Sequence, residues 1–304
     1  MDSKKLIEDI LKLKNDRNAV ILAHNYQVPE VQDIGDFVGD SLELARKAKE
    51  TDAEVIVFCG VDFMAETAAI INPQKTVLMP AWDALCPMAA MLPPEVIRKA
   101  REEYPEAEVV MYVNTLAAAK VYADCICTSA NIVKVINSMD SDTILFAPDK
   151  NMAYYVSKRT DKKIIAVPRY GICAVHNNIK LEDVEGAKAV HPKAKLTVHP
   201  ETPPEVQEMA DYIGSTKQMI EYVRENDSKE FIIGTEVDII HRMNKEAPGK
   251  KFYPSSDKAI CKNMKKINLL NIRESLEKMQ HRIEVPEKIA DGARKAIQRM
   301  LDLK

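Results

Sequence analysis

The chain repeats itself three times, and this repeat constrains its fold more than any other feature. Three segments each begin with a short apolar run and end in a polar triplet, at residues 24–26, 112–114 and 199–201. A hydroxyl residue follows the first residue of each triplet after 17 positions, namely Ser41, Ser129 and Thr216. The triplets recur after 88 and then 87 residues. A fixed period of this length indicates three copies of one supersecondary unit.

The repeat continues downstream of each triplet. A second apolar run ends near Asp62, Asp149 or Glu236, and a third runs into a proline at position 80, 168 or 254. Amphipathic stretches predict helices before each first strand, at 3–16, 94–103 and 181–190, and between strands, at 41–50, 129–138 and 216–225. Strands that alternate with helices favour parallel sheets buried on both faces. The sequence therefore predicts an α/β fold of three αβα, Rossmann-like modules.

The repeat also predicts where one module ends and the next begins. The expected modules span residues 1–88, 89–176 and 177–263 in the 304-residue chain. The tail, residues 264–304, contains two helical stretches broken at Val285 and Pro286, and we expect it to pack on the first module. If the modules surround a pseudo-threefold axis, their equivalent residues converge at one point. Ligands of parallel sheets bind beyond the carboxyl ends of the strands, where the triplets lie.

Three of the six cysteines follow the period. Cys86, Cys173 and Cys261 are separated by 87 and 88 residues, whereas Cys59, Cys125 and Cys127 are expected in the core or in loops. A [4Fe-4S] cluster normally takes four cysteines, so a cluster held by three keeps one iron open as a Lewis acid. Two alternatives remain open: three equivalent turns that bury a thiol, or a structural zinc site completed by a residue such as His176. Closely spaced ligand pairs, which are typical of structural zinc, are absent from the sequence.

The triplets supply groups that can move protons. Glu201 is the best candidate for a general acid or base, because burial is expected to move its pKa toward neutrality. Tyr26 is expected to relay a proton or hold a carbonyl group, and His24, Tyr112 and Asn114 are expected to orient substrate oxygens. His199 belongs to the same set of strand-end residues.

The three hydroxyl residues are expected to cap helices. Ser41, Ser129 and Thr216 each precede or begin an amphipathic stretch, and a helix N-terminus favours anions through its free N–H groups and its dipole. Three such sites in register favour a substrate with several negative groups, such as carboxylates and a phosphate.

Charge and hydropathy exclude several classes of partner. The net charge of −3 gives no indication of nucleic-acid or membrane binding. No apolar run approaches the ~20 residues of a membrane span, and no signal-peptide pattern opens the chain. We therefore expect a cytoplasmic protein.

At these residues the chain resembles the quinolinate synthase family, which acts in the de novo biosynthesis of NAD. The similar motifs cover the whole chain: A-H-N-Y-Q at Ala23–Gln27, G-D-S at Gly39–Ser41, Y-V-N-T at Tyr112–Thr115, T-S-A-N at Thr128–Asn131, H-P-E at His199–Glu201 and G-S-T at Gly214–Thr216. The resemblance implies a triangular arrangement of the modules around a central active site. It also implies that Cys86, Cys173 and Cys261 bind the cluster.

The family's reaction condenses iminoaspartate with dihydroxyacetone phosphate to quinolinate, phosphate and water, and the resemblance implies this activity. It implies a functional link to an enzyme that produces iminoaspartate. The resemblance implies catalytic roles for Glu201, Tyr26, His24 and Tyr112. It implies a substrate pocket lined by His24, Ser41, Tyr112, Asn114, Ser129, His199, Glu201 and Thr216. The C-x-x-C-x-x-C motif that some bacterial members carry near the C-terminus is absent.

Two competing functions remain open from the sequence. One is another enzyme with three modules and a three-cysteine cluster, such as hydroxymethylbutenyl diphosphate reductase or the radical enzyme of diphthamide synthesis. The other is a non-catalytic iron–sulfur sensor or electron carrier, which would not require the strand-end His, Tyr, Asn and Glu residues.

Overall fold

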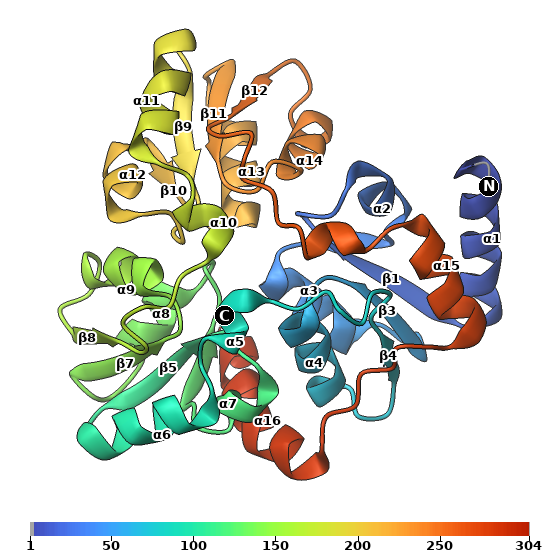
Figure 1. Ribbon diagram of the computed structural model, residues 1–304, viewed down its shortest axis with the longest axis horizontal. Coiled ribbons are helices and arrows are strands. Elements are labelled where there is room, and N and C mark those ends of the chain that lie inside the picture. Colours follow the sequence, from blue (N-terminus) through green and yellow to red (C-terminus); the bar gives the residue numbers. More distant parts are fainter. Residues whose placement is uncertain (1–2, 304) are drawn as a thin grey trace.

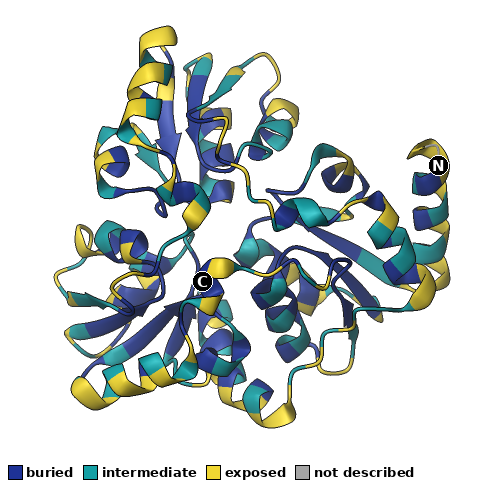
Figure 2. Cartoon of the chain, in the orientation of Figure 1, coloured by how far each residue is buried: buried dark blue, intermediate teal, exposed yellow. Residues whose placement is uncertain are grey.

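Three separate parallel sheets of four strands each form the molecule. The computed structural model describes residues 3–303, and the sheets are arranged in a triangle around a common centre (Figure 1). Helices cover the sheets, so the α/β fold of three αβα modules is confirmed. The two central strands of each sheet are largely buried, and the outer faces of the helices are exposed (Figure 2). We call the modules first, second and third by their sheets; their residue boundaries stay a prediction, and residues 1–2 and 304 of the expected ranges lie outside the described residues.

The three sheets share one strand order. In each, the first strand in the chain is flanked by the second and the third, and the fourth lies outermost beside the third. The first sheet contains β1 (Ala19–His24), β2 (Phe37–Gly39), β3 (Val55–Cys59) and β4 (Thr76–Leu78). The second contains β5 (Glu108–Tyr112), β6 (Cys125–Cys127), β7 (Thr143–Ala147) and β8 (Lys163–Ala166). The third contains β9 (Lys195–Val198), β10 (Tyr212–Ile213), β11 (Glu230–Gly234) and β12 (Lys251–Pro254).

The structure contains one strand per module that the sequence did not predict, because the sequence predicted three strands in each and each sheet has four. The missing edge strands β2, β6 and β10 are only two or three residues long. Each is positioned by an aspartate just before it, whose carboxylate accepts a backbone N–H from the neighbouring strand. The pairs are Asp36 with Ile21 (2.8 Å), Asp124 with Val109 (2.7 Å) and Asp211 with Leu196 (2.8 Å).

The helices repeat in the same way. Those before the first strands are α1 (Ser3–Asp16), α6 (Pro94–Glu103) and α11 (Leu181–Val190), with the predicted bounds. After the first strands come α2 (Pro29–Ile34), α7 (Ala117–Lys120) and α12 (Pro204–Met209), then α3 (Ser41–Glu50), α8 (Ile132–Asn137) and α13 (Thr216–Glu225). After the third strands come α4 (Asp62–Ile71), α9 (Lys150–Ser157) and α14 (Ile239–Glu246). Short turns follow the fourth strands: α5 (Pro87–Ala90), α10 (Ala174–Asn177) and the 3₁₀ turn η1 (Met264–Lys266).

The tail forms two helices with different neighbours. Helix α15 (Leu269–Lys278) packs against α1 of the first module. Helix α16 (Glu287–Asp302) contacts α4 of the first module and also α7 and β6 of the second (Figure 1). The buried face of α16 is therefore shared between two modules. Among residues 3–303, no helix is long and apolar enough to cross a bilayer.

Candidate active site

The same backbone contact fixes each of the three repeated cysteines. Each cysteine lies in the loop after the fourth strand of its module, and its backbone N–H donates to the acidic residue that follows the third strand. The pairs are Cys86 with Asp62 Oδ1 (2.9 Å), Cys173 with Asp149 Oδ2 (2.9 Å) and Cys261 with Glu236 Oε1 (3.1 Å). The acids that recur in the sequence therefore hold the three loops in equivalent positions at the carboxyl ends of the sheets.

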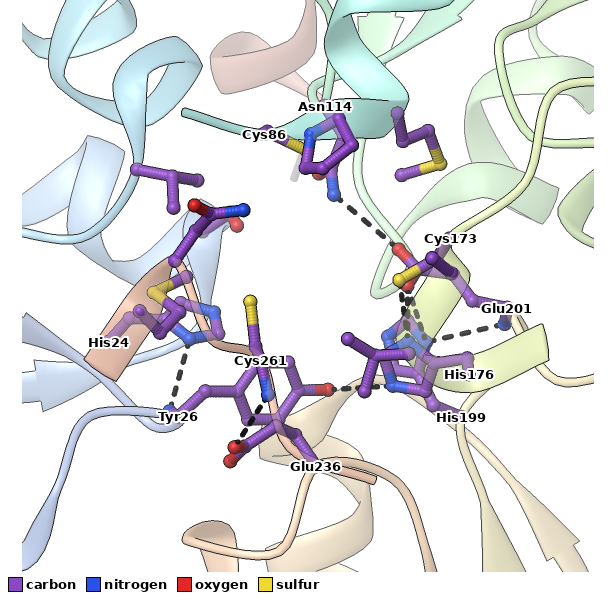
Figure 3. Close-up of a pocket in the computed structure, with 18 of the residues that line it drawn as sticks. His24, Tyr26, Cys86, Asn114, Cys173, His176, His199, Glu201, Glu236 and Cys261 are labelled. Carbon is purple, nitrogen blue, oxygen red and sulfur yellow. Dashed lines mark hydrogen bonds and ion pairs between the residues drawn. The ribbon is translucent and has the colours of Figure 1, made fainter. Parts of the chain in front are cut away.

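These loops surround one cavity of about 340 Å³ at the centre of the triangle. The three sulfurs project into it from three different modules (Figure 3). Every site residue expected from the sequence lies on its wall: His24, Tyr26, Ser41, Cys86, Tyr112, Asn114, Ser129, Cys173, His199, Glu201, Thr216 and Cys261. The other cysteines, Cys59, Cys125 and Cys127, are buried in strands β3 and β6 and do not line the cavity.

The three cavity cysteines are free thiols. Burial raises the pKa of each thiol above its usual value, so the metal-free protein holds them protonated at neutral pH. Among residues 3–303, the ligand atoms of Cys173, His176 and Glu201 form a compact group in which all lie within 4.8 Å of one another. The site therefore contains a candidate metal centre, and at least one of the repeated cysteines belongs to it.

A continuous line of hydrogen bonds joins Tyr26 of the first module to Glu201 of the third, and both of these end residues lie on the cavity wall. The hydroxyl oxygens of Tyr26 and Thr235 lie 2.6 Å apart, and Thr235 Oγ1 lies 2.8 Å from His176 Nε2. The other ring nitrogen, Nδ1, lies 2.6 Å from Glu201 Oε2. Thr235 did not emerge from the sequence, and His176 emerged only as a zinc ligand. A tyrosine, a histidine and a glutamate joined in this way can pass protons between them.

The pKa of Glu201 moves in the direction opposite to the expectation. Its side chain is 3% exposed, and burial alone would raise the pKa. The neighbouring His176 and His199 outweigh burial, together with hydrogen bonds from His176 and Tyr112, and hold the pKa well below its usual range. Asn114 Nδ2 also donates to Glu201 Oε1 at 3.5 Å. Glu201 is therefore a buried carboxylate and not a carboxylic acid poised near neutrality.

Two further histidines are uncharged. Burial lowers the pKa of both His24 and His199 to about 3. The Nδ1 atom of His24 accepts the backbone N–H of Tyr26 at 3.2 Å, and that of His199 accepts the N–H of Glu201 at 3.3 Å. Since a neutral imidazole that accepts at Nδ1 carries its proton at Nε2, each ring is a hydrogen-bond donor at Nε2. For His199 this donor reaches Ser129 Oγ at 3.1 Å.

The three hydroxyl residues line the cavity but do not cap helices, so that expectation is wrong. Ser41 is the first residue of α3, which Asp40 caps, and Thr216 is the first residue of α13, which Ser215 caps. Ser129 lies in a turn before α8, which begins only at Ile132. The hydroxyl groups are therefore free for other partners. Thr216 Oγ1 accepts from Asn25 Nδ2 at 2.7 Å, across the boundary between the first and third modules.

Comparisons with known proteins identify the family of the chain. Residues 8–302 match the family model described as "Quinolinate synthetase A protein". The chain is 58% identical over 298 residues to the quinolinate synthase of Pyrococcus horikoshii, which covers 98% of this chain and 99% of that protein. It is 56% identical over 303 residues to that of Thermococcus onnurineus, with both chains covered completely. It is 54% identical over 304 residues to that of Methanocaldococcus jannaschii, at 98% and 99% coverage. The chain therefore belongs to the quinolinate synthetase A protein family of enzymes.

Proposed function

We propose that the chain condenses iminoaspartate with dihydroxyacetone phosphate and releases quinolinate, phosphate and water. The observation that carries the proposal is the convergence of three cysteines and a buried, hydrogen-bonded acid–base line on one cavity. The relatives named quinolinate synthase support it. Membership of an enzyme family gives no support to a non-catalytic sensor.

In this proposal a [4Fe-4S] cluster is held by Cys86, Cys173 and Cys261. The donor set fits such a group: three free, partly buried thiols face one cavity from three modules, and the remaining cysteines are confined to strands. Metal binding would replace the protons that burial keeps on these thiols. With three thiolates for four irons, the bound cluster would supply an open iron that acts as a Lewis acid toward a departing hydroxyl group.

A single metal ion on Cys173, His176 and Glu201 is the competing assignment. It has the advantage of a compact ligand group. However, it would take His176 and Glu201 out of the hydrogen-bonded line and leave Cys86 and Cys261 without a role. The cluster assignment uses all three repeated cysteines and leaves the acid–base line intact, so we favour it.

Some polar residues of the cavity then transfer protons, and others bind the substrates. Glu201 Oε2, as a carboxylate, accepts a proton from substrate, and His176 shares that proton through Nδ1. The Nε2 proton of His176 then moves to Thr235 Oγ1, and Thr235 gives its own hydroxyl proton to Tyr26. The Tyr26 hydroxyl, at the other end of the line on the cavity wall, gives up its proton in turn. A proton taken up at one point can thus be returned at another without bulk water.

Anionic oxygens of the substrates are bound by neutral donors in this account. The Nε2–H groups of His24 and His199 and the amide of Asn114 can donate to carboxylate or phosphate oxygens. Tyr112, Ser41, Ser129 and Thr216 add hydroxyl groups on the same wall. Neutral donors bind both anions without trapping the product by a strong ion pair.

The remaining expectations follow from this reaction. An enzyme that produces iminoaspartate would be the functional partner, no nucleic acid or membrane would be bound, and the cytoplasm would be the location. The direct test is an anaerobic assay for quinolinate from the two substrates. Formation of quinolinate without an electron donor or S-adenosylmethionine supports the proposal and separates it from the other three-module cluster enzymes. Absence of quinolinate with fully loaded protein would refute it.

A further inference from the structure

One buried carboxyl group on the cavity wall has an oxygen with no partner. Asp40 is 5% exposed and lines the cavity directly before Ser41. Its Oδ1 atom caps helix α3, accepting from the backbone N–H groups of Leu42 (3.0 Å) and Glu43 (2.9 Å). Its Oδ2 atom is buried and forms no hydrogen bond. A buried polar atom without a partner calls for an explanation.

Capping alone does not require the second oxygen. Ser215 holds the equivalent position in the third module and caps α13 with the same capping box, using a single hydroxyl oxygen. Gln218 N donates to Ser215 Oγ at 3.3 Å, and Gln218 Oε1 accepts from Ser215 N at 2.9 Å. The second module has Thr128 at this position, again with one side-chain oxygen. Only the first module places a carboxyl group here.

The surroundings of Asp40 favour its neutral form. Among residues 3–303, no lysine, arginine or histidine forms an ion pair with it. Burial raises the pKa of Asp40, and the nearby charge of Glu43 adds to the effect; the two capping N–H groups and the Ser215 hydroxyl oppose it. The Ser215 hydroxyl is close enough to act on the carboxyl group, but Oδ2 has no hydrogen-bond partner.

We propose that Asp40 is a substrate-binding acid: its Oδ1 caps α3 as a carbonyl oxygen, and its Oδ2–H donates a hydrogen bond to an anionic substrate oxygen held beside Ser41. The inference rests on the proposed function, since both substrates carry such oxygens. The acceptor is a carboxylate oxygen of iminoaspartate or a phosphate oxygen of dihydroxyacetone phosphate. A neutral carboxylic acid can donate to either, whereas a carboxylate would repel both.

Two substitutions separate donation from capping. Asp40→Asn keeps an oxygen for the cap and offers an N–H in place of Oδ2–H, whereas Asp40→Ser keeps only the cap, as Ser215 does. In anaerobic holoenzyme we expect D40N to retain KM within about threefold, and D40S to raise the KM of one substrate by about tenfold or more, the loss expected for one hydrogen bond to a charged group. In both variants kcat should change less than KM. The substrate whose KM rises identifies the acceptor as carboxylate or phosphate.

Glu43→Gln is the matched control. Its amide oxygen can still accept from Asp40 N, now 3.1 Å from Glu43 Oε2, and Glu43 does not line the cavity. It removes the smaller of the two causes that raise the pKa of Asp40 and leaves burial, the larger one, in place. Asp40 therefore keeps its proton in E43Q, and we expect both KM values to stay near wild type.

The possible results distinguish the proposals. Wild-type KM values in D40S would show that Asp40 is only a cap, and equal impairment of D40N and D40S would refute the donor role. If D40S fails to fold or to load its cluster, Asp40→Thr, the residue of the second module, gives the same comparison. Failure of the wild-type holoenzyme to form quinolinate would instead refute the proposed function.

Discussion

His176 Nδ1 lies 2.6 Å from Glu201 Oε2, and this contact connects the loop of a candidate metal ligand to the acid–base line. His176 stands three residues after Cys173, and its Nδ1 atom lies 3.1 Å from the sulfur. The same imidazole reaches Thr235 through Nε2 at 2.8 Å. The ring of His176 therefore contacts Cys173, Glu201 and Thr235 at once. Its contact with Glu201 helps to explain why this buried glutamate remains ionised beside the cavity.

Loss of the carboxylate should separate catalysis from metal binding. Glu201→Gln keeps the size of the side chain but cannot take a proton, so we expect kcat to fall by at least about 100-fold. The iron and sulfide content should stay at the wild-type level, because Glu201 is not among the three proposed ligands. Glu205→Gln, an exposed change in the neighbouring helix, is the control. Loss of iron from E201Q would favour the single-ion assignment.

Interrupting the line at its middle should have a smaller effect. Thr235→Val keeps the shape of the side chain but removes the hydroxyl between Tyr26 and His176. We expect kcat to fall by about tenfold, because Tyr26 OH remains 3.4 Å from His176 Nε2 and a poorer direct link survives. Thr235→Ser should restore most of the rate, with KM unchanged in both variants. Equal rates for T235V and wild type would exclude a proton path through Thr235.

The cysteines should fall into two groups. Replacing Cys86, Cys173 or Cys261 with alanine should remove most of the bound iron and lower kcat/KM by at least about 100-fold, since each is a proposed ligand. Cys59→Ala and Cys127→Ala should keep iron and activity and lose only about 1 kcal/mol of folding free energy from core packing. Iron content after anaerobic reconstitution measures the difference. Retention of full iron by any one of the first three variants would contradict the ligand set.

Acid should destabilise the metal-free protein through its neutral histidines. The pKa of His24 is lowered from 6.5 to about 3, so the unfolded chain binds more protons than the folded one between these values. Stability from this group is therefore present above pH 6.5 and is lost as the pH falls toward 3. Between pH 7 and pH 5 we expect wild type to lose about 2 kcal/mol more free energy of unfolding than His24→Gln, as measured by urea denaturation. Parallel pH profiles for the two proteins would show that His24 is protonated in the folded state.

The threefold repeat made most of the fold predictable from the sequence. Helices at 3–16, 41–50, 94–103, 181–190 and 216–225 have their predicted bounds, because amphipathic periodicity is clear over ten or more residues. Edge strands of two or three residues, such as β10, are too short to show any periodicity. Asp40 and Ser215 precede Ser41 and Thr216 and are themselves capping residues, so the sequence alone could not decide which of each pair is the cap.

The sequence predicted many of the residues that line the cavity, but not their electrostatics or the contacts between modules. Equivalent positions in the repeat identified the cysteines and the strand-end residues, which line one cavity. The pKa of Glu201 depends on His176, which the fold brings in from another loop, and Thr235 joins Tyr26 only across a module boundary. Contacts of this kind depend on how the modules are oriented, and no local pattern in the sequence records that orientation.

Mössbauer spectroscopy of protein reconstituted anaerobically with ⁵⁷Fe tests the central claim most directly. If the three cysteines hold a [4Fe-4S] cluster, the protein should contain about four irons and four sulfides per chain. One iron subsite should change its signal when a dicarboxylate is added, and the other three should not respond. A single metal ion per chain, or four irons that all ignore the added dicarboxylate, would contradict it.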